Sequence, residues 1–384
     1  MVYTRQIVAK DETVYETLAS IEALDALEAE WDELVRAMPK PTPFLLHGWV
    51  RAWLEHYAQD AAPAIHIARR DRQLVAALPL VVRRRFGLRI ASFVGDDRPF
   101  VDVLLAPGEE LETARALCDF AAQSHDCASL GMISAESTIV RACGKRLRLI
   151  PRVGAPVLDL SNGFEQTYHE KYSSKARREH ARRRRKLDEL GKVEFVLAKT
   201  PEELEPALDD AFRLHALRWE GRFDGSTFRT EEGMAFNREA LRALAKDDIV
   251  RIITLRLNGQ AIAFEYYFLV GERMYRYRHG WDPAYANYRL GVLNGLAAIE
   301  RASDEGATTA EHLGGTEQHK LEFSSRIEGL NVGIGLRGSV RGAVYSKTTA
   351  LALASRMRLK RFKALRRLYL EHVAPRLQKR RRSH

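Results

Sequence analysis

The segment that decides the fold is residues 252–320, IITLRLNGQAIAFEYYFLVGERMYRYRHGWDPAYANYRLGVLNGLAAIERASDEGATTAEHLGGTEQHK. Two apolar runs meet at Asn258-Gly259, the strongest short signal for a β-hairpin, and a third strand follows them. A turn with Arg289 and Gly291 then opens a Leu/Ala-rich helix, and one more strand ends at Gly314-Gly315. This order places a basic turn at a helix N-terminus, where free N–H groups and the helix dipole favour an anion such as phosphate.

The first half of the chain resembles this segment. Residues 65–82 and 252–270 share the order strand, polar turn, Gln and longer apolar strand, and a helix and another strand follow each. We interpret this as a diverged internal duplication, which predicts two related halves of α/β (α+β) type. Prolines and glycines between 151 and 163 place the boundary there. The expected domains are 1–155, 156–345 and a basic amphipathic C-terminal helix, 346–384.

Apolar periodicity locates the other elements. Trp49, Trp53 and Tyr57 form an aromatic stripe on one helix, and core packing explains that stripe best. We expect further helices over residues 13–38, 111–123, 173–190, 204–219 and 231–244, and strands over 65–68, 74–82, 129–134, 250–257, 260–270, 273–280 and 308–313.

The composition is that of a globular chain with two local basic patches. Of 384 residues, 46% are hydrophobic, and the net charge is +10. Residues 175–186 hold 8 Lys/Arg and one Glu, and residues 356–384 hold 12 and one Glu, so the rest has a net charge of −8. A general coat of positive charge, as nucleic-acid binders often have, is therefore excluded.

Neither a membrane span nor a secretory signal is expected from the sequence, so the predicted compartment is the cytoplasm. The three cysteines, Cys118, Cys127 and Cys143, match no metal-ligand spacing, and their odd number favours reduced thiols. We expect no metal. The tail after residue 356 interleaves apolar residues with cations, so peripheral contact with an anionic membrane, at the inner membrane face, stays open beside a helix packed on the body.

Residues 173–190 predict a long basic helix that includes Arg177 and Arg178. Such a charge run is either a solvated helix face or a collar for a phosphorylated or acidic substrate. Eight cations beside one carboxylate repel one another unless anions approach, so both interpretations stay open.

Three side chains of residues 252–320 are candidates for chemistry. Glu265 either pairs with Arg278 across the hairpin or acts as a general base. His279 ends the third strand and either has a structural role or accepts a proton near neutral pH. Lys320 follows the Gly314-Gly315 pair and either points to solvent or meets a phosphate or developing oxyanion.

Several motifs together resemble the GNAT acyltransferase superfamily, in particular the CelD-like acetyltransferases of cellulose biosynthesis, which are related to the FemAB peptidyltransferases. The resemblance covers most of residues 30–325. The motifs that carry it are Pro43-Phe44 with Trp49 and Trp53, Ser174-x-x-Arg177-Arg178, Asn258-Gly259-Gln260, Asp282-Pro283-x-Tyr285 leading to Gly291, and Gly315-x-Glu317-x-x-Lys320.

The resemblance implies tandem GNAT-like domains, with mixed sheets flanked by helices, and a donor site in the second domain. It also implies acetyl-CoA or another acyl-CoA as co-substrate, and direct attack on the thioester by an amine or hydroxyl of a small-molecule or lipid-linked sugar acceptor. The first domain would shape the acceptor side. The expected site residues are His279, Glu265 and Lys320 for catalysis, Arg289, Leu290, Gly291, Gly314 and Gly315 for the donor, and Arg177, Arg178, Arg278 and Tyr277 for substrate.

Two alternatives remain at this stage. GNAT enzymes usually have a longer Gln/Arg-x-x-Gly-x-Gly/Ala loop, whereas here one residue separates Arg289 from Gly291. This difference keeps a FemAB-like transfer from aminoacyl-tRNA open, with tRNA as partner of the basic helix. The second alternative is a non-catalytic protein that binds nucleic acid or an anionic membrane surface.

Overall fold

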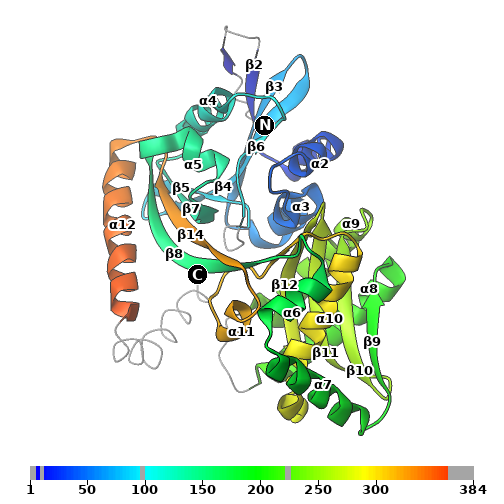
Figure 1. The fold of residues 1–384 in the computed structure, drawn as a ribbon. Helices are drawn as coiled ribbons and strands as arrows, with labels where there is room; N and C mark the ends of the chain where they lie inside the picture. Colours follow the sequence, from blue (N-terminus) through cyan, green and yellow to red (C-terminus); the bar gives the residue numbers. More distant parts are fainter. Residues whose placement is uncertain (1–5, 9–12, 96–99, 221–225, 362–384) are drawn as a thin grey trace.

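One mixed sheet runs through the whole molecule. The computed structural model describes residues 6–8, 13–95, 100–220 and 226–361. Within this part of the chain the strands are ordered β1-β2-β3-β4-β5-β7-β14-β8-β13-β12-β11-β10-β9, with β6 beside β4. Helices flank this sheet along its length (Figure 1), so the predicted mixed α/β class is confirmed.

The first half combines a strand meander with helices before and after it. Its elements are β1 Gln6–Val8, β2 Thr13–Leu18, α1 Ile21–Asp25, α2 Glu28–Arg36, α3 His47–Tyr57, β3 Ala62–Arg70, β4 Gln73–Arg85, β5 Leu88–Phe93, β6 Leu104–Leu105, α4 Leu111–Ala121, β7 Cys127–Ser134, α5 Thr138–Cys143 and β8 Leu147–Asp159.

The second half has the same order, with two added helices at its start. Its elements are α6 Phe164–Lys171, α7 Ser174–Asp188, β9 Val193–Ala198, α8 Pro201–Arg218, α9 Glu231–Ala245, β10 Val250–Leu257, β11 Gln260–Val270, β12 Arg273–Trp281, the 3-10 helix η5 Pro283–Tyr288, α10 Leu290–Asp304, β13 Thr309–Glu311, α11 Gln318–Leu321, β14 Arg326–Gly335 and α12 Val340–Arg361.

The predicted helix over residues 13–38 is wrong at its start. Thr13–Leu18 is strand β2, which pairs with β3, and only after it do helices α1 and α2 begin. Helix α1 begins after Ser20, because the Ser20 side chain accepts a hydrogen bond from Ala23 N–H at 3.3 Å and so caps the helix. Residues 13–18, TVYETL, include β-branched and aromatic residues, which favour a strand, although the spacing of the apolar residues suggested a helix.

The strand pairing repeats between the two halves. Among the strand pairs of the described residues, β5 with β7 and β12 with β13 are the parallel ones. In each case a helix, α4 or α10, lies between the paired strands in the chain. This shared order supports the interpretation of the chain as a tandem arrangement of two related units.

The C-terminal part of the chain returns to the first half. Strand β14 pairs with β7 and β8, and α12 packs on the same strands. The expected domain boundary at 155/156 lies inside β8, which also pairs with β13, and the division into domains stays a prediction. The expected C-terminal helix begins earlier than predicted, at Val340, and residues 362–384 lie outside the described part.

An aromatic cluster joins the two halves. Trp49 of α3 is fully buried, and its ring contacts those of Phe44, Phe236 and Tyr277 at centroid distances of 5.1, 5.0 and 5.5 Å. Phe236 belongs to α9 and Tyr277 to β12, so the expected core role of this tryptophan is confirmed. The apolar core therefore continues from one half into the other.

Replacing this tryptophan should lower the stability of the whole chain. Trp49→Ala leaves a cavity where both halves meet, and we expect a loss of about 3–5 kcal/mol in the free energy of unfolding. Urea denaturation followed by circular dichroism measures it. Phe86→Ala is the matched control, because Phe86 is 79% exposed and its loss should change stability by less than about 0.5 kcal/mol. Equal midpoints for the two variants would contradict the shared core.

Candidate active site

The parallel strands β12 and β13 separate after only three paired residues, the last pair being Tyr275 with Glu311. Beyond that pair, β12 continues along β11 as far as Trp281. On the other side His312 N–H donates to Pro156 O of β8 at 3.0 Å, so β13 follows a different neighbour. The two strands therefore diverge, and β12 borders an opening in the sheet from Arg276 onward.

A cavity of about 260 Å³ lies at this opening. Its walls come from β12, from α10 with the turn before it, from α11 and its surroundings, and from the segment before α7. The lining residues are Tyr172, Arg276, His279, Trp281, Ala286, Arg289, Gly291, Val292, Gly295, Leu296, Ile299, His319 and Phe323.

The N-terminus of α10 lies at the cavity wall. Arg289 has left-handed backbone angles, φ 50° and ψ 47°, and redirects the chain from η5 into the helix. The bonds of the first turn begin with Val292 N–H donating to Arg289 O at 2.9 Å, so the amides of Leu290 and Gly291 precede them. A Cβ on Gly291 would lie 2.8 Å from the Trp281 ring, which explains the glycine. This turn has the features of an anion site.

The expected cross-strand pair of Glu265 with Arg278 is wrong. A β-bulge between β11 and β12 adds a residue on β12 and shifts the register, so that Glu265 lies opposite His279. The buried Glu265 Oε1 instead accepts from Arg276 Nε at 2.7 Å. An ion pair was expected for this carboxylate, and the structure supplies one with a different arginine.

Tyr277 and Arg278 contact other parts of the second half and do not line the cavity. Tyr277 O–H donates to Asn237 Oδ1 of α9 at 3.0 Å, and Tyr277 is buried. The guanidinium carbon of Arg278 lies 5.8 Å from the ring centroid of Phe228, which precedes α9. The structure therefore separates both residues from His279, which does line the cavity.

Two histidines face each other at the cavity wall. The rings of His279 and His319 have a centroid distance of 5.8 Å. Burial, with the guanidinium groups of Arg218 and Arg276 nearby, lowers the pKa of His279 well below its ordinary value of 6.5. Burial also lowers the pKa of His319, and Arg276 adds to that effect. Both imidazoles are therefore neutral at neutral pH, and each has a nitrogen lone pair that can accept a proton.

Lys320 is held by its own loop. Its Nζ donates to Gly314 O at 3.0 Å and lies 3.2 Å from Glu317 Oε2, and burial lowers its pKa. Gly315 has φ 121°, which favours glycine, and a Cβ on Gly314 would lie 2.7 Å from Met132 Cε of β7. The two glycines therefore permit a turn and a close contact with the first half, while Lys320 lies near the cavity without lining it.

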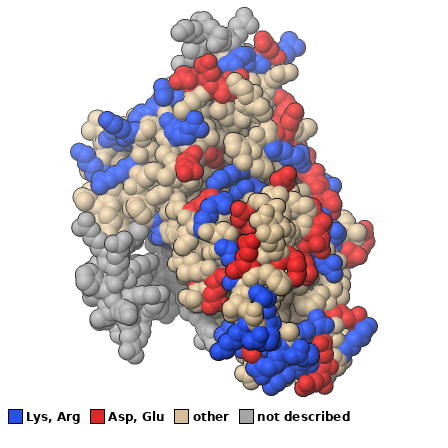
Figure 2. All heavy atoms as spheres, viewed as in Figure 1, with Lys and Arg blue, Asp and Glu red and all other residues tan. Residues whose placement is uncertain are grey.

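Some cations of the basic helix α7 bind other parts of the protein, and others are exposed to solvent. Arg177 Nη1 donates to His169 O at 3.0 Å and also to Tyr172 O, so it closes the C-terminal end of α6. Arg178 is exposed and has no ion-pair partner among the residues described. Figure 2 shows Lys and Arg side chains gathered where α7 lies. Arg178 is therefore accessible at the surface, which both interpretations of the basic helix require, whereas Arg177 is held by contacts within the fold.

The sequence interpretation missed three residues that the tertiary structure places at the site: Arg276, His312 and His319. Arg276 alternates with tyrosines along β12, and His319 lies inside the Gly315-x-Glu317-x-x-Lys320 motif. Their positions in these elements were a signal, but nothing local showed that Arg276 Nη1 and His312 Nδ1 would lie 2.8 Å apart.

A second cavity, of about 440 Å³, lies in the first half. Carboxylates line it, among them Asp102, Glu109 and Glu136. Asp102 accepts from the amides of Thr138 and Ile139 at 2.6 and 2.8 Å, and burial raises its pKa to about 6. This cavity is larger, but Lys40 and Arg141 line it together with the carboxylates, and the turn before α10 lies at the other cavity, so the cavity beside β12 is the candidate active site.

Within the described ranges, no group of three or more His, Cys, Asp or Glu side chains is arranged to hold a metal ion. No helix in the same ranges is both long enough and apolar enough to span a bilayer.

Three solved structures are similar in fold. FemX has 10% sequence identity and a TM-score of 0.59, and the match covers 83% of this chain and 97% of FemX. The C-terminal domain of a putative lysylphosphatidylglycerol synthetase from Agrobacterium fabrum has 11% identity and a TM-score of 0.53, covering 85% and 97%. L-PGS from Bacillus licheniformis has 11% identity and a TM-score of 0.50, covering 80% and 96%. At these identities the likeness concerns the fold alone.

No curated protein matches the chain in sequence. Residues 174–321 match the family model described as acetyltransferase (GNAT) domain. The matched range begins with α7 and ends with α11, so it includes the diverging strands, the start of α10 and the cavity between them. Residues 174–321 are therefore similar to acetyltransferase domains of the GNAT type.

Proposed function

We propose that this protein transfers an acyl group, acetyl in the first instance, from acyl-CoA to an amine or hydroxyl of a sugar precursor. The observation that carries the proposal is the cavity between β12 and β13, with Arg289 and the first amides of α10 at its wall. A thioester donor with a pyrophosphate group matches both features, because the amides and Arg289 suit the phosphates while the opening admits the acyl arm.

The chemistry follows from these positions. The acceptor nitrogen or oxygen attacks the acyl carbon, and the C=O electrons move to oxygen. They then re-form the double bond as the C–S bond breaks. The acceptor proton passes to neutral His279 or His319, and the departing thiolate takes up a proton. Positioning of donor and acceptor supplies most of the acceleration, so the mechanism requires no covalent enzyme intermediate.

Removing the cation at the start of α10 should weaken donor binding. We expect CoA to bind the wild type with a dissociation constant below the millimolar range, and Arg289→Ala to weaken it by about tenfold, because a charge-assisted phosphate contact is lost. Isothermal titration with CoA measures both. Arg301→Ala, on an exposed residue near the other end of α10, is the matched control and should change the constant by less than about twofold. No binding to the wild type would remove acyl-CoA as donor.

The acceptor is proposed from the resemblance to CelD-like acetyltransferases: a small-molecule or lipid-linked sugar precursor of the cell envelope or an exopolysaccharide. The first half would form the acceptor side, since Phe100 at its cavity contacts Tyr275 of β12 at a ring distance of 6.1 Å. Glu265, Arg177, Arg278 and Tyr277 keep structural roles in this proposal, because their contacts are with the protein itself.

A second candidate is a FemAB-like transfer from aminoacyl-tRNA. Cations on α7 favour it, because Lys175, Arg178, Arg185 and Lys186 are exposed without an ion-pair partner among the described residues. Helix α7, which carries them, follows Tyr172, and Tyr172 lines the cavity, so a polyanion could lie along the helix while its acyl end entered the opening.

Salt dependence separates this candidate from the first. If tRNA is the donor, its binding should weaken steeply with salt, and glutamate at positions 175, 178, 185 and 186 should abolish most of it, because phosphate contacts release counterions. Filter binding of total tRNA at several salt concentrations measures the slope. Glutamate at Lys192 and Lys246, exposed cations outside α7, serves as control. Salt-steep binding lost only in the α7 variant would favour tRNA over CoA.

Peripheral contact with an anionic membrane, at the cytoplasmic face of the inner membrane, is a further part of the proposal. Helix α12 supports it, because Val340, Val344 and Leu351 are 83%, 61% and 61% exposed and their spacing puts them on one side of the helix. Much of the basic tail that would add electrostatic attraction falls in 362–384, outside the described residues.

Vesicle sedimentation tests this contact. The full chain should sediment with vesicles containing anionic lipid and not with neutral ones, and deletion of residues 350–384 should abolish it, because both cations and apolar residues are lost. Serine at positions 340, 344 and 351 keeps every charge and should weaken sedimentation partly. Full-length protein that stays in the supernatant with anionic vesicles would remove the membrane proposal.

A further inference from the structure

Arg276 lies where β12 and β13 begin to diverge, and one of its nitrogens has no partner in the part of the chain that the structure describes. Nε donates to Glu265 Oε1 at 2.7 Å, and Nη1 donates to His312 Nδ1 at 2.8 Å. Among the residues described, nothing accepts a hydrogen bond from Nη2, and Arg276 lines the cavity. A Cβ on Gly295 would lie 2.7 Å from Nη2, so the glycine of α10 makes room for the guanidinium group.

The partners of Arg276 fix its orientation. A guanidinium nitrogen can only donate, so His312 Nδ1 accepts, and His312 Nε2–H must donate to Phe323 O at 2.8 Å. Burial, followed by the charge of Arg276, lowers the pKa of His312 well below its ordinary value. His312 is therefore a neutral imidazole in one tautomer. The buried carboxylate of Glu265 balances the charge of Arg276, so the guanidinium is held by strand β11 and by the residue that follows β13.

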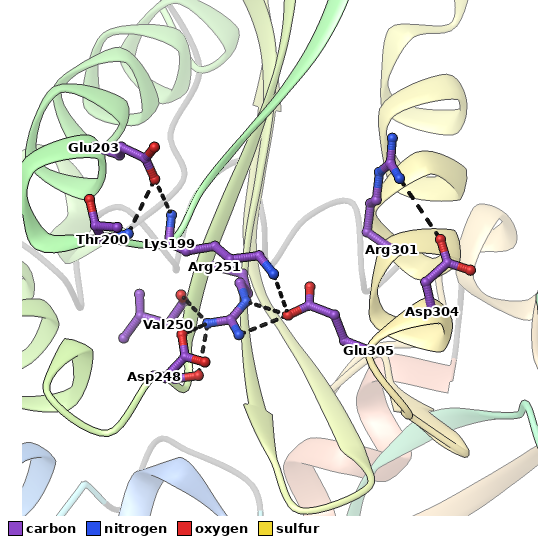
Figure 3. Close-up of polar contacts among 9 residues, drawn as sticks. All are labelled: Lys199, Thr200, Glu203, Asp248, Val250, Arg251, Arg301, Asp304 and Glu305. Atoms are coloured by element: carbon purple, nitrogen blue, oxygen red, sulfur yellow. Dashed lines mark hydrogen bonds and ion pairs between the residues drawn. The ribbon is translucent and has the colours of Figure 1, made fainter.

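A buried arginine with a structural role looks different in the same sheet. Arg251 of β10 is 3% exposed; its Nε and Nη2 donate to Glu305 Oε2 at 3.0 and 2.8 Å (Figure 3). Its Nη1 donates to the backbone and carboxylate oxygens of Asp248 and to Val250 O. Each nitrogen of this side chain has an acceptor, and neither cavity includes the residue.

The contrast with Arg251 points to a ligand for Arg276. Each nitrogen of Arg251 has an acceptor in the fold, whereas Nη2 of Arg276 has none among the described residues and is open to the cavity, where a ligand oxygen can accept from it. Lys320, another nearby cation, already directs its ammonium group to Gly314 O and Glu317. Of these cations, Arg276 is the one that is both fixed and directed at the cavity.

We propose that Arg276 Nη2 donates to the acyl oxygen of the donor and stabilises the oxyanion formed when the acceptor attacks. Glu265 and His312 are positioning residues that hold the guanidinium in place before the reaction, so little reorganisation is needed in the transition state. The inference rests on the proposed acyl transfer from acyl-CoA.

An equilibrium measurement tests this role without knowledge of the acceptor. S-carboxymethyl-CoA is a stable thioether whose carboxylate places an anionic oxygen near the position of the thioester oxygen, whereas CoA lacks such an oxygen. We expect the wild type to bind S-carboxymethyl-CoA about 10- to 100-fold more tightly than CoA, as one charge-assisted hydrogen bond allows. Arg276→Gln should abolish this preference and leave CoA binding within about threefold.

Variants of the positioning residue His312 should change the preference for S-carboxymethyl-CoA over CoA to different degrees. His312→Ala should reduce the preference for S-carboxymethyl-CoA, and His312→Asn should restore part of it, because an amide oxygen can still accept from Arg276. A purely structural role for His312 would change stability without changing this ratio. Arg251→Gln is the matched control: it should lower the unfolding midpoint while the preference persists.

The outcomes are distinguishable. If the wild type binds CoA but shows no preference, or Arg276→Gln retains the preference, the role of Arg276 is overturned and the acyl-CoA proposal stands. If the wild type binds neither compound, the acyl-CoA proposal is overturned, and this inference with it. Should Arg276→Gln not fold because Glu265 is left unpaired, the double variant with Glu265→Gln removes both charges and gives the same test.

Discussion

The site depends on the point at which strands β12 and β13 stop pairing, after Tyr275 and Glu311. Each strand has a second neighbour, β11 for β12 and β8 for β13, and hydrogen bonds to those neighbours continue where the shared pairing stops. These bonds hold each strand on its outer side although the two strands separate.

Charges are arranged around that opening in pairs and single cations. Arg276 is balanced by Glu265 and Lys320 by Glu317, so these two buried cations add little net charge. Arg289 is exposed at the start of α10 and forms no ion pair among the described residues. The histidines at the wall are kept neutral by burial and by these cations. The result is a cationic rim, which suits an anion, beside an interior with neutral imidazoles.

The first half differs from the second in the features on which the proposed acyl-donor site rests. Its strands β5 and β7 are parallel like β12 and β13, but Glu110 precedes α4 where Arg289 precedes α10. Asp102 and Glu109 line the adjacent cavity. The two halves nevertheless pack against each other. Strand β14 of the second half pairs with β7 of the first, and Trp49 packs against Phe236 and Tyr277.

Local pattern alone identified the hairpin at Asn258-Gly259, the turn at Arg289 and the Gly314-Gly315 segment, because turn chemistry and apolar alternation are properties of neighbouring residues. It failed for Thr13–Leu18, where the apolar spacing suited a helix and pairing with β3 decided otherwise. It also failed for the partner of Glu265, since a single bulge changes which side chains meet. The sequence by itself determined the order of elements and the basic start of α10. Only the tertiary structure decided that Arg276 and His319 line one cavity and that His312 contacts Arg276, because these contacts join strands and helices whose relative positions depend on packing across the whole sheet.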